Sequence, residues 1–215
     1  RQFQNHTAND TQADGLTHSS IWCIVKDNQG TLWLGTYFGG VNYFNPEYEI
    51  YTRYSYSSNE KKGLSNPVVG RTIEDRDGNL WIGTEGGGLN YYNRRTREFK
   101  WYRPQEGRNS ISHNNVKALY YDADKEIIWI GTHLGGLNKL DIRSGHFTHY
   151  RMEEGNPNTL PSDIIRDIIP YKSLLIIATQ NGVCLFDPAN GQCQQLFKFR
   201  YKSRFICQWD MKKSR

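Results

Sequence analysis

The feature that most constrains this chain is one phrase that recurs along it at a fixed interval. Residues 79–90 read NLWIGTEGGGLN, and close copies stand at residues 31–42 and 128–138. The tryptophans of the three copies lie 48 residues apart, and a degraded fourth copy stands at residues 175–183. A repeat of this length constrains the architecture before any single residue is interpreted, because every repeat must form the same unit.

Each repeat predicts four short strands. In the second repeat, an apolar segment before residue 74 is followed by a turn at 75–78, the tryptophan phrase, a segment at 89–92 and an alternating segment at 99–102. The turns are rich in Asp, Asn and Gly, which tolerate positive φ and favour hairpins. No segment keeps a helical period. Four antiparallel strands per 48 residues predict an all-β chain of about four β-propeller blades.

The chain is expected to be a single propeller region over residues 1–215. An open arc of blades exposes apolar faces and strand edges. Either the first strand closes a small four-bladed ring, or two chains join in an eight-bladed ring, and we expect self-association. The expected parts are an outer strand of a preceding or closing blade at 1–11, blades at 12–59, 60–107, 108–155 and 156–199, and a basic tail or the start of a further blade at 200–215.

The repeated tryptophan is the expected anchor between blades. A buried indole contributes about 150–250 Å² of contact surface. The glycine two positions later is expected to let a neighbouring backbone approach closely. In the fourth copy Ile176 and Ala178 stand at these positions, which indicates a different neighbour. The structural anchors predicted on this basis are Trp33, Trp81, Trp129, Gly35, Gly83 and Gly131.

The net charge of +5 belongs to the end of the chain. The last eighteen residues hold seven basic side chains against Asp210, so the remainder is close to neutral. A basic tail of this kind is usually a solvated end, and no nucleic-acid partner is expected. No run approaches the length of about eighteen apolar residues that a membrane helix needs, so no direct insertion is expected.

The four cysteines lack the paired CxxC spacing of a zinc site. Cys184 and Cys193 flank a turn, and both a disulfide and two buried thiols are compatible with that placement. No cofactor is expected.

Two loop sets are expected to meet at one end of the propeller, the loop before the first strand and the loop after the second. Equivalent positions in these loops change in residue type while the surrounding frame repeats. Flat aromatic and hydrogen-bonding side chains on such a frame suit sugar recognition, although each residue alone is as readily an ordinary solvated loop residue. Trp22 is a further aromatic candidate. The predicted ligand-binding residues are Tyr37, Phe38, Asn66, Arg71, Glu85, His113, His133 and Gln180.

Metal binding and catalysis are weaker interpretations. His18, His113 and His133 come from two loop sets and from different blades, so no metal site is expected. Residues 75–79 resemble the start of a calcium loop, but the downstream glutamate of that loop is missing. Glu85 with His133 could be imagined as a base and an acid, yet no nucleophile motif accompanies them, so we expect no catalytic residues.

The phrase Asp-x-x-Gly-x-Leu-Trp-Ile-Gly-Thr-x-x-Gly-Gly-Leu, seen best at residues 75–89, closely resembles the two-component regulator propeller repeat. The resemblance implies the extracytoplasmic, periplasmic sensor region of a hybrid two-component system, as in gut Bacteroidetes. Members of this family carry two seven-bladed propellers, a β-sandwich, a membrane helix and cytoplasmic kinase, receiver and DNA-binding domains, and their ligands are often oligosaccharides. These 215 residues hold about four blades and no kinase or DNA-binding motif.

The resemblance therefore implies a non-catalytic, ligand-sensing propeller fragment that recognises oligosaccharides, with kinase activity in domains outside these residues. The alternative is a structural or protein-interaction propeller that self-assembles without a small ligand. A propeller lyase is the weaker third interpretation.

Overall fold

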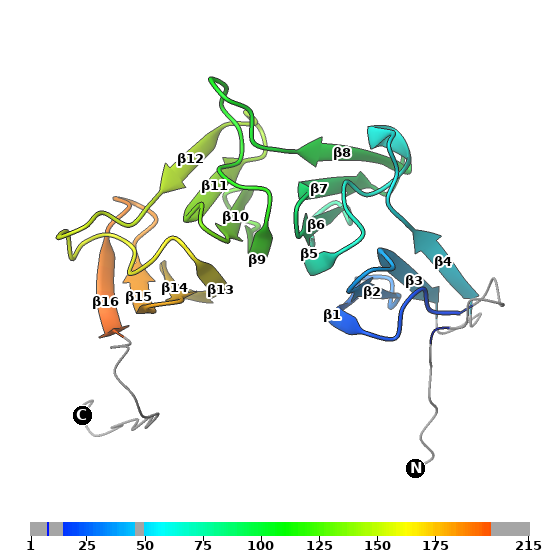
Figure 1. Ribbon diagram of the computed structural model, residues 1–215, viewed down its shortest axis with the longest axis horizontal. Helices are drawn as coiled ribbons and strands as arrows, with labels where there is room; N and C mark the ends of the chain where they lie inside the picture. Colours follow the sequence, from blue (N-terminus) through cyan, green and yellow to red (C-terminus); the bar gives the residue numbers. More distant parts are fainter. Residues whose placement is uncertain (1–7, 9–14, 46–49, 199–215) are drawn as a thin grey trace, which may run out of the picture.

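The computed structural model describes residues 8, 15–45 and 50–198. These residues form sixteen strands and one short 3-10 helix, η1 (Glu60–Lys62). The strands make four separate antiparallel sheets, each with its four strands in sequence order (Figure 1). The prediction of an all-β chain of propeller blades is confirmed. The predicted strand at 1–11 and the tail at 200–215 lie outside the described residues, apart from Ala8.

The strand bounds follow the repeat. The first blade has β1 (Ile21–Lys26), β2 (Leu32–Thr36), β3 (Val41–Asn45) and β4 (Ile50–Tyr54). The second blade has β5 (Val69–Glu74), β6 (Leu80–Thr84), β7 (Gly88–Asn93) and β8 (Glu98–Tyr102). The third blade has β9 (Val116–Asp122), β10 (Ile127–Thr132), β11 (Leu137–Asp141) and β12 (Phe147–Tyr150). The fourth blade has β13 (Ile165–Tyr171), β14 (Leu174–Thr179), β15 (Gly182–Phe186) and β16 (Cys193–Lys198).

The four blades stand side by side in an open arc. Figure 1 shows the first strand of each blade on the inner side of the arc and the fourth strand on the outside. The innermost strands β1, β5, β9 and β13 each contact the next one along the arc. Closure of this arc, by residues 1–11 or by a second copy, stays a prediction.

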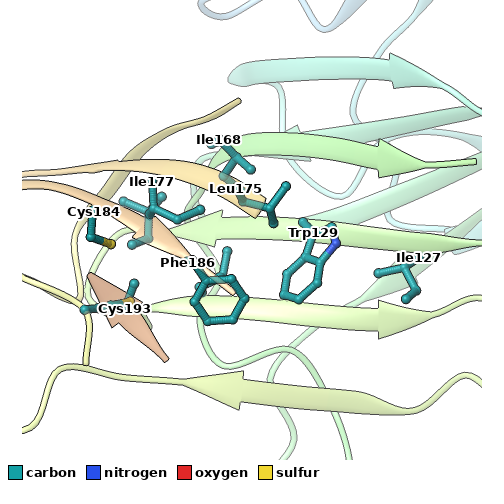
Figure 2. Packing of buried hydrophobic residues seen from close by; sticks show 12 residues of the cluster. Ile127, Trp129, Ile168, Leu175, Ile177, Cys184, Phe186 and Cys193 are labelled. Atoms are coloured by element: carbon teal, nitrogen blue, oxygen red, sulfur yellow. The ribbon is translucent and has the colours of Figure 1, made fainter. Parts of the chain in front are cut away.

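The core consists of three apolar clusters, one between each pair of neighbouring blades. Each of the three repeated tryptophans sits in one of these interfaces and is at most 2% exposed. Figure 2 shows the interface between the third and fourth blades, where the ring centroids of Trp129 and Phe186 lie 5.4 Å apart. Burial of these rings holds each blade to the next, because one small sheet cannot cover both of its own faces.

The glycine after each tryptophan makes room for a side chain of the next blade. A Cβ atom on Gly35 would lie 2.7 Å from Cγ1 of Val69, and one on Gly83 would lie 2.6 Å from Cγ1 of Val116. Gly131 faces Ile165 in the same way. The expectation of a closely approaching backbone differs from the structure in this detail: the nearest neighbour of Gly83 and of Gly131 is a β-branched side chain of the next innermost strand, and Gly35 is crowded by Sγ of Cys23 as well as by Val69.

The fourth blade buries two free thiols in the interface with the third blade, Cys184 and Cys193. They lie on the neighbouring strands β15 and β16 (Figure 2). Their mutual hydrogen bond and their burial raise the pKa of Cys184 above that of an ordinary thiol. Of the two arrangements that the sequence allowed, the structure has the pair of buried thiols.

Candidate ligand-binding face at the loop end

Two sets of loops meet at one end of the arc, called here the loop end. The lead-in loop precedes the first strand of a blade, and the second loop follows the second strand. The backbone N–H groups of Tyr37, Glu85, His133 and Gln180, each just after a second strand, donate to the lead-in loop of the same blade over 2.9 to 3.1 Å. The loop end therefore extends the pairing of the inner two strands, and its side chains stand on a hydrogen-bonded frame.

A second set of backbone hydrogen bonds joins neighbouring blades at the loop end. The N–H of Gly88 donates to the carbonyl of Asn114 over 2.7 Å, and Gly40 and Gly136 make the equivalent bonds. Gly88 has φ of 80°, which an L side chain adopts only with strain. A Cβ there would also collide with the carbonyl oxygen of Tyr102. Glycine at this position therefore fixes the height of one loop relative to the next.

A buried asparagine on the third strand holds each lead-in loop. Asn90 accepts a hydrogen bond from the backbone N–H of Ser65 over 2.8 Å, and its own amide donates to the Ser65 hydroxyl over 2.8 Å. Asn42 pairs with Thr17, and Asn138 with Ser112, in the same two-way manner. These asparagines are fully buried. We call this pair the asparagine latch.

The variable position of the lead-in loop also has a local structural role. The side chains of His18, Asn66, His113 and Ser162 each accept a hydrogen bond from the backbone N–H two residues further on, over 2.9 to 3.1 Å. These different residue types share a side-chain acceptor atom that can reach the backbone N–H two residues later. Asn66 and His113 were predicted as ligand-binding residues, and the structure shows that each of them stabilises its own turn.

That turn selects one tautomer of neutral His113. Because its Nδ1 accepts from the N–H of Asn115, the proton of the neutral ring is on Nε2. Burial, followed by the neighbouring His133 and Arg151, lowers the pKa of His113 below its usual value. His113 and His133 thus lie close enough to influence each other, and Nε2–H of His113 is a donor.

Three aromatic side chains of the first blade form a cluster at the loop end. The rings of Trp22 and Tyr37 are stacked, with centroids 5.0 Å apart and planes inclined by 28°. Phe38 meets Tyr37 edge to face at 5.0 Å. Trp22, Tyr37 and Phe38 are 47%, 40% and 59% exposed. We call these three residues the aromatic platform, since large exposed rings held against one another present a flat apolar surface.

Each innermost strand has a register irregularity near its start, at the equivalent residues Trp22, Gly70, Lys117 and Arg166. A bulge turns a side chain away from the regular alternation of the strand and is frequent next to functional sites. We call the inner side of the loop end, which these four residues line, the inner mouth.

Lys117 joins three blades at the inner mouth. Its Nζ forms an ion pair with the carboxylate of Glu85 in the second blade. The same Nζ lies 5.8 Å from the ring centroid of Trp22 in the first blade, a cation–π contact. The second blade has Gly70 at the equivalent position, so no side chain stands between them.

A second contact also passes over a blade. Arg71 in the second blade forms an ion pair with Asp167 in the fourth, with Nη2 and Oδ1 2.6 Å apart. The equivalent residue of the third blade is Ala118, whose small side chain leaves the path open. Arg166 beside Asp167 donates to Oε1 of Gln180 over 3.2 Å.

The structure therefore brings most of the predicted site residues to one end of the arc but does not gather them at one point. Tyr37 and Phe38 lie in the platform, Glu85 and Arg71 take part in inter-blade ion pairs, and Gln180 stands in the most distant blade. Sequence reasoning missed Lys117, Arg166 and Asp167. Their position in the repeat was the available signal, since Lys117 and Arg166 align with the candidate Trp22.

Within the described part of the chain, no three His, Cys, Asp or Glu side chains are grouped so that they could hold a metal ion. In the same residues, no helix has the length and apolar character needed to cross a membrane.

Comparison with known proteins identifies the repeat. The profile of the family described as two component regulator propeller matches residues 15–38, 63–86 and 110–133. Each match runs from a lead-in loop to the loop after the second strand, which is the part that builds the loop end. Three stretches of the chain thus match the two-component regulator propeller repeat, and the described residues fold as β-propeller blades. No curated protein matches the sequence.

Solved structures share this fold. The extracellular domain of the putative hybrid two component system BT3049 from B. thetaiotaomicron superposes with a TM-score of 0.72 at 26% identity, over 83% of this chain and 24% of that one. The extracellular domain of BT4673 from the same organism gives 0.68 at 23% identity, over 83% and 25%. PorZ of Porphyromonas gingivalis gives 0.64 at 20%, over 89% and 29%. The chain thus spans about a quarter of the length of these neighbours.

Proposed function

We propose that this chain is an extracytoplasmic, ligand-sensing propeller module that binds an oligosaccharide at its loop end without transforming it. The observation that carries the proposal is the aromatic platform, in which Trp22 and Tyr37 are stacked and about half exposed. The likeness to extracellular domains of sensor proteins supports a sensing role and a periplasmic location.

A sugar ring has apolar C–H faces and a polar edge, so it binds best where a flat aromatic surface adjoins hydrogen-bonding groups. The platform supplies the first. Close to it, Glu85 supplies carboxylate oxygens and Lys117 an ammonium group, and the two are already paired. Asn66 and His113 present further polar atoms on loops that are fixed to the frame. Because these loops are already ordered, the protein loses little conformational entropy when it binds a ligand.

The test is calorimetric titration of the protein with a panel of oligosaccharides, combined with Trp22→Ala and Tyr37→Ala. Each variant should weaken binding by about five- to tenfold, because one stacking contact of this kind contributes about 1–1.5 kcal/mol. Tyr56→Ala is the matched control, since Tyr56 is 57% exposed and lies on the loop that leaves the outermost strand β4. Unchanged affinity in both platform variants would discard this site.

The second candidate is a protein-interaction module in which two copies complete one ring. Its support is the apolar surface at the two ends of the arc, where Ile24 of the first blade is 63% exposed and Ile169 and Phe197 of the fourth are 49% and 57% exposed. Light scattering at increasing concentration should then report a dimeric mass, and Ile169→Lys should return the monomer. A monomeric mass at every concentration would reject this candidate.

A further inference from the structure

The inner mouth carries more positive than negative charge. Arg71, Lys117 and Arg166 come from the innermost strands of three successive blades, at or next to the bulges. Of the carboxylates, Glu85 is paired with Lys117, and Asp167 is paired with Arg71.

The partner of Arg166 is different. Its guanidinium donates to the amide oxygen of Gln180, which carries no charge. The side chain is exposed. Arg166 is the one cation of this set whose partner is neutral, and it stands at the same level of the repeat as Lys117 in the adjacent blade. A planar guanidinium in this situation is suited to a carboxylate, because its parallel N–H groups match the two carboxylate oxygens.

The positions of these groups along the arc also set a minimum length for the ligand. The platform belongs to the first blade, Lys117 belongs to the third but reaches Trp22, and Arg166 belongs to the fourth. A monosaccharide cannot contact both Trp22 and Arg166 across this series of blades, whereas an oligosaccharide can follow it along the inner mouth.

Resting on the proposed function, we infer that the ligand is an acidic oligosaccharide, with one sugar ring stacked on the aromatic platform and a carboxylate bound by Arg166. Lys117 lies between these two contacts and interacts with the middle of the ligand. Gln180 accepts a hydrogen bond from Arg166 and in this way acts as a positioning residue for its guanidinium.

The test uses short uronate oligomers and the same oligomers after chemical reduction of the carboxylates to primary alcohols. Each pair keeps its linkage and ring stereochemistry and differs only in whether each sugar carries a carboxylate or a neutral hydroxymethyl group. Calorimetric titration should give an affinity at least tenfold higher for at least one acidic oligomer than for its reduced form. Raising the salt concentration should weaken that preference, since exposed charges are screened.

Arg166→Gln should lower the affinity for the acidic oligomer by about tenfold and leave the reduced form unchanged. Arg95→Gln is the control, because it removes the same charge from an exposed arginine in the turn between β7 and β8, at the other end of the blade. An equal loss in both variants would mean that the net charge of the protein, and not Arg166, causes the preference.

The remaining outcomes separate the two proposals. If acidic and reduced forms bind equally and Trp22→Ala weakens both, the acidic class is wrong while oligosaccharide binding at the platform stands. If only neutral oligosaccharides bind, the inference is likewise overturned. If no oligosaccharide of either kind binds the folded protein, both proposals fail.

Discussion

The second and fourth blades have the same four-stranded topology but are held in place by different residues. The second blade has the buried Trp81, the asparagine latch between Asn90 and Ser65, and an aspartate that accepts from the indole. The fourth has Ile176 in place of the tryptophan, Cys184 in place of the asparagine and Pro161 in place of the serine.

The last two replacements belong together. Proline has no backbone N–H to donate, and a thiol is a poor acceptor, so the fourth blade loses donor and acceptor at once. No buried N–H is left without a partner by the change. The difference between the blades indicates that the two positions of the latch depend on each other: a blade has both the asparagine and its hydroxyl-bearing partner, or it has neither.

The largest effect should come from removing the tryptophan anchor. Trp81→Ala leaves a cavity between the second and third blades and should lower the free energy of unfolding by about 3–5 kcal/mol. Ile176→Ala, at the equivalent place on the half-buried outer face of the fourth blade, should cost only about 1–2 kcal/mol. Urea unfolding of both variants measures the difference, and equal losses would contradict a special role for the indole.

The latch can be tested as a unit by converting the second blade to the fourth-blade pair. Asn90→Cys leaves the buried N–H of Ser65 without an acceptor and should cost about 1–3 kcal/mol. Adding Ser65→Pro removes that N–H, so the double variant should be more stable than the sum of the two single changes predicts, by about 0.5–3 kcal/mol. A strictly additive double-mutant cycle would show that the two replacements are independent.

The second and third blades differ in the role of the aspartate that precedes the tryptophan phrase. Asp75 accepts a hydrogen bond from the indole N–H of Trp81 over 3.1 Å, and Asp27 does the same for Trp33. In the third blade Trp129 follows Asp122 by seven positions, one more than the six between Asp75 and Trp81, and the indole N–H of Trp129 is buried without a partner among the described residues.

Asp75→Ala should therefore destabilise the protein by about 1–2 kcal/mol, because it leaves a buried indole N–H unpaired. Asp122→Ala, at the matching place in the third blade, should cost less than about 0.5 kcal/mol, since its carboxylate contacts only the exposed turn through Lys125. Thermal unfolding of the two variants is sufficient, and a larger loss in Asp122→Ala would reverse the assignment.

The smallest expected effect concerns pH and compares Asn66 with His113, which close equivalent turns. The folded protein favours neutral His113, because its pKa lies below the usual value of 6.5. The stability that His113 contributes is thus complete above about pH 6.5 and is lost as the pH falls through the lowered pKa. His113→Asn keeps an acceptor for the turn and should remove part of the decrease in the unfolding midpoint between pH 7 and pH 5. If the unfolding midpoint of this variant decreases as much as that of the unchanged protein, other titratable groups cause the decrease.

The sequence predicted the fold well because the repeat and the alternating burial are properties of single strands and turns. The place of Tyr37 and Glu85 at the loop end was predicted for the same reason, since a loop position that varies within a constant frame is visible in one sequence. Lys117 and Arg166 were not found. In regular alternation a residue beside buried Val116 or Ile165 simply faces the other way, and only the bulge places it at the inner mouth. Contacts such as Arg71–Asp167, between residues 96 positions apart, follow from the curvature of the arc, which no local pattern encodes.

The two contacts that pass over a blade, Lys117 with Trp22 and Arg71 with Asp167, depend on the curvature of the arc. The distance from Lys117 to Trp22 depends on two successive inter-blade angles, and so does the distance from Arg71 to Asp167. A small change of angle at each interface adds up across the intervening blade. Flattening of the arc therefore separates both pairs at once, and a molecule that holds the first and fourth blades at a fixed distance limits the combined curvature of the three interfaces between them.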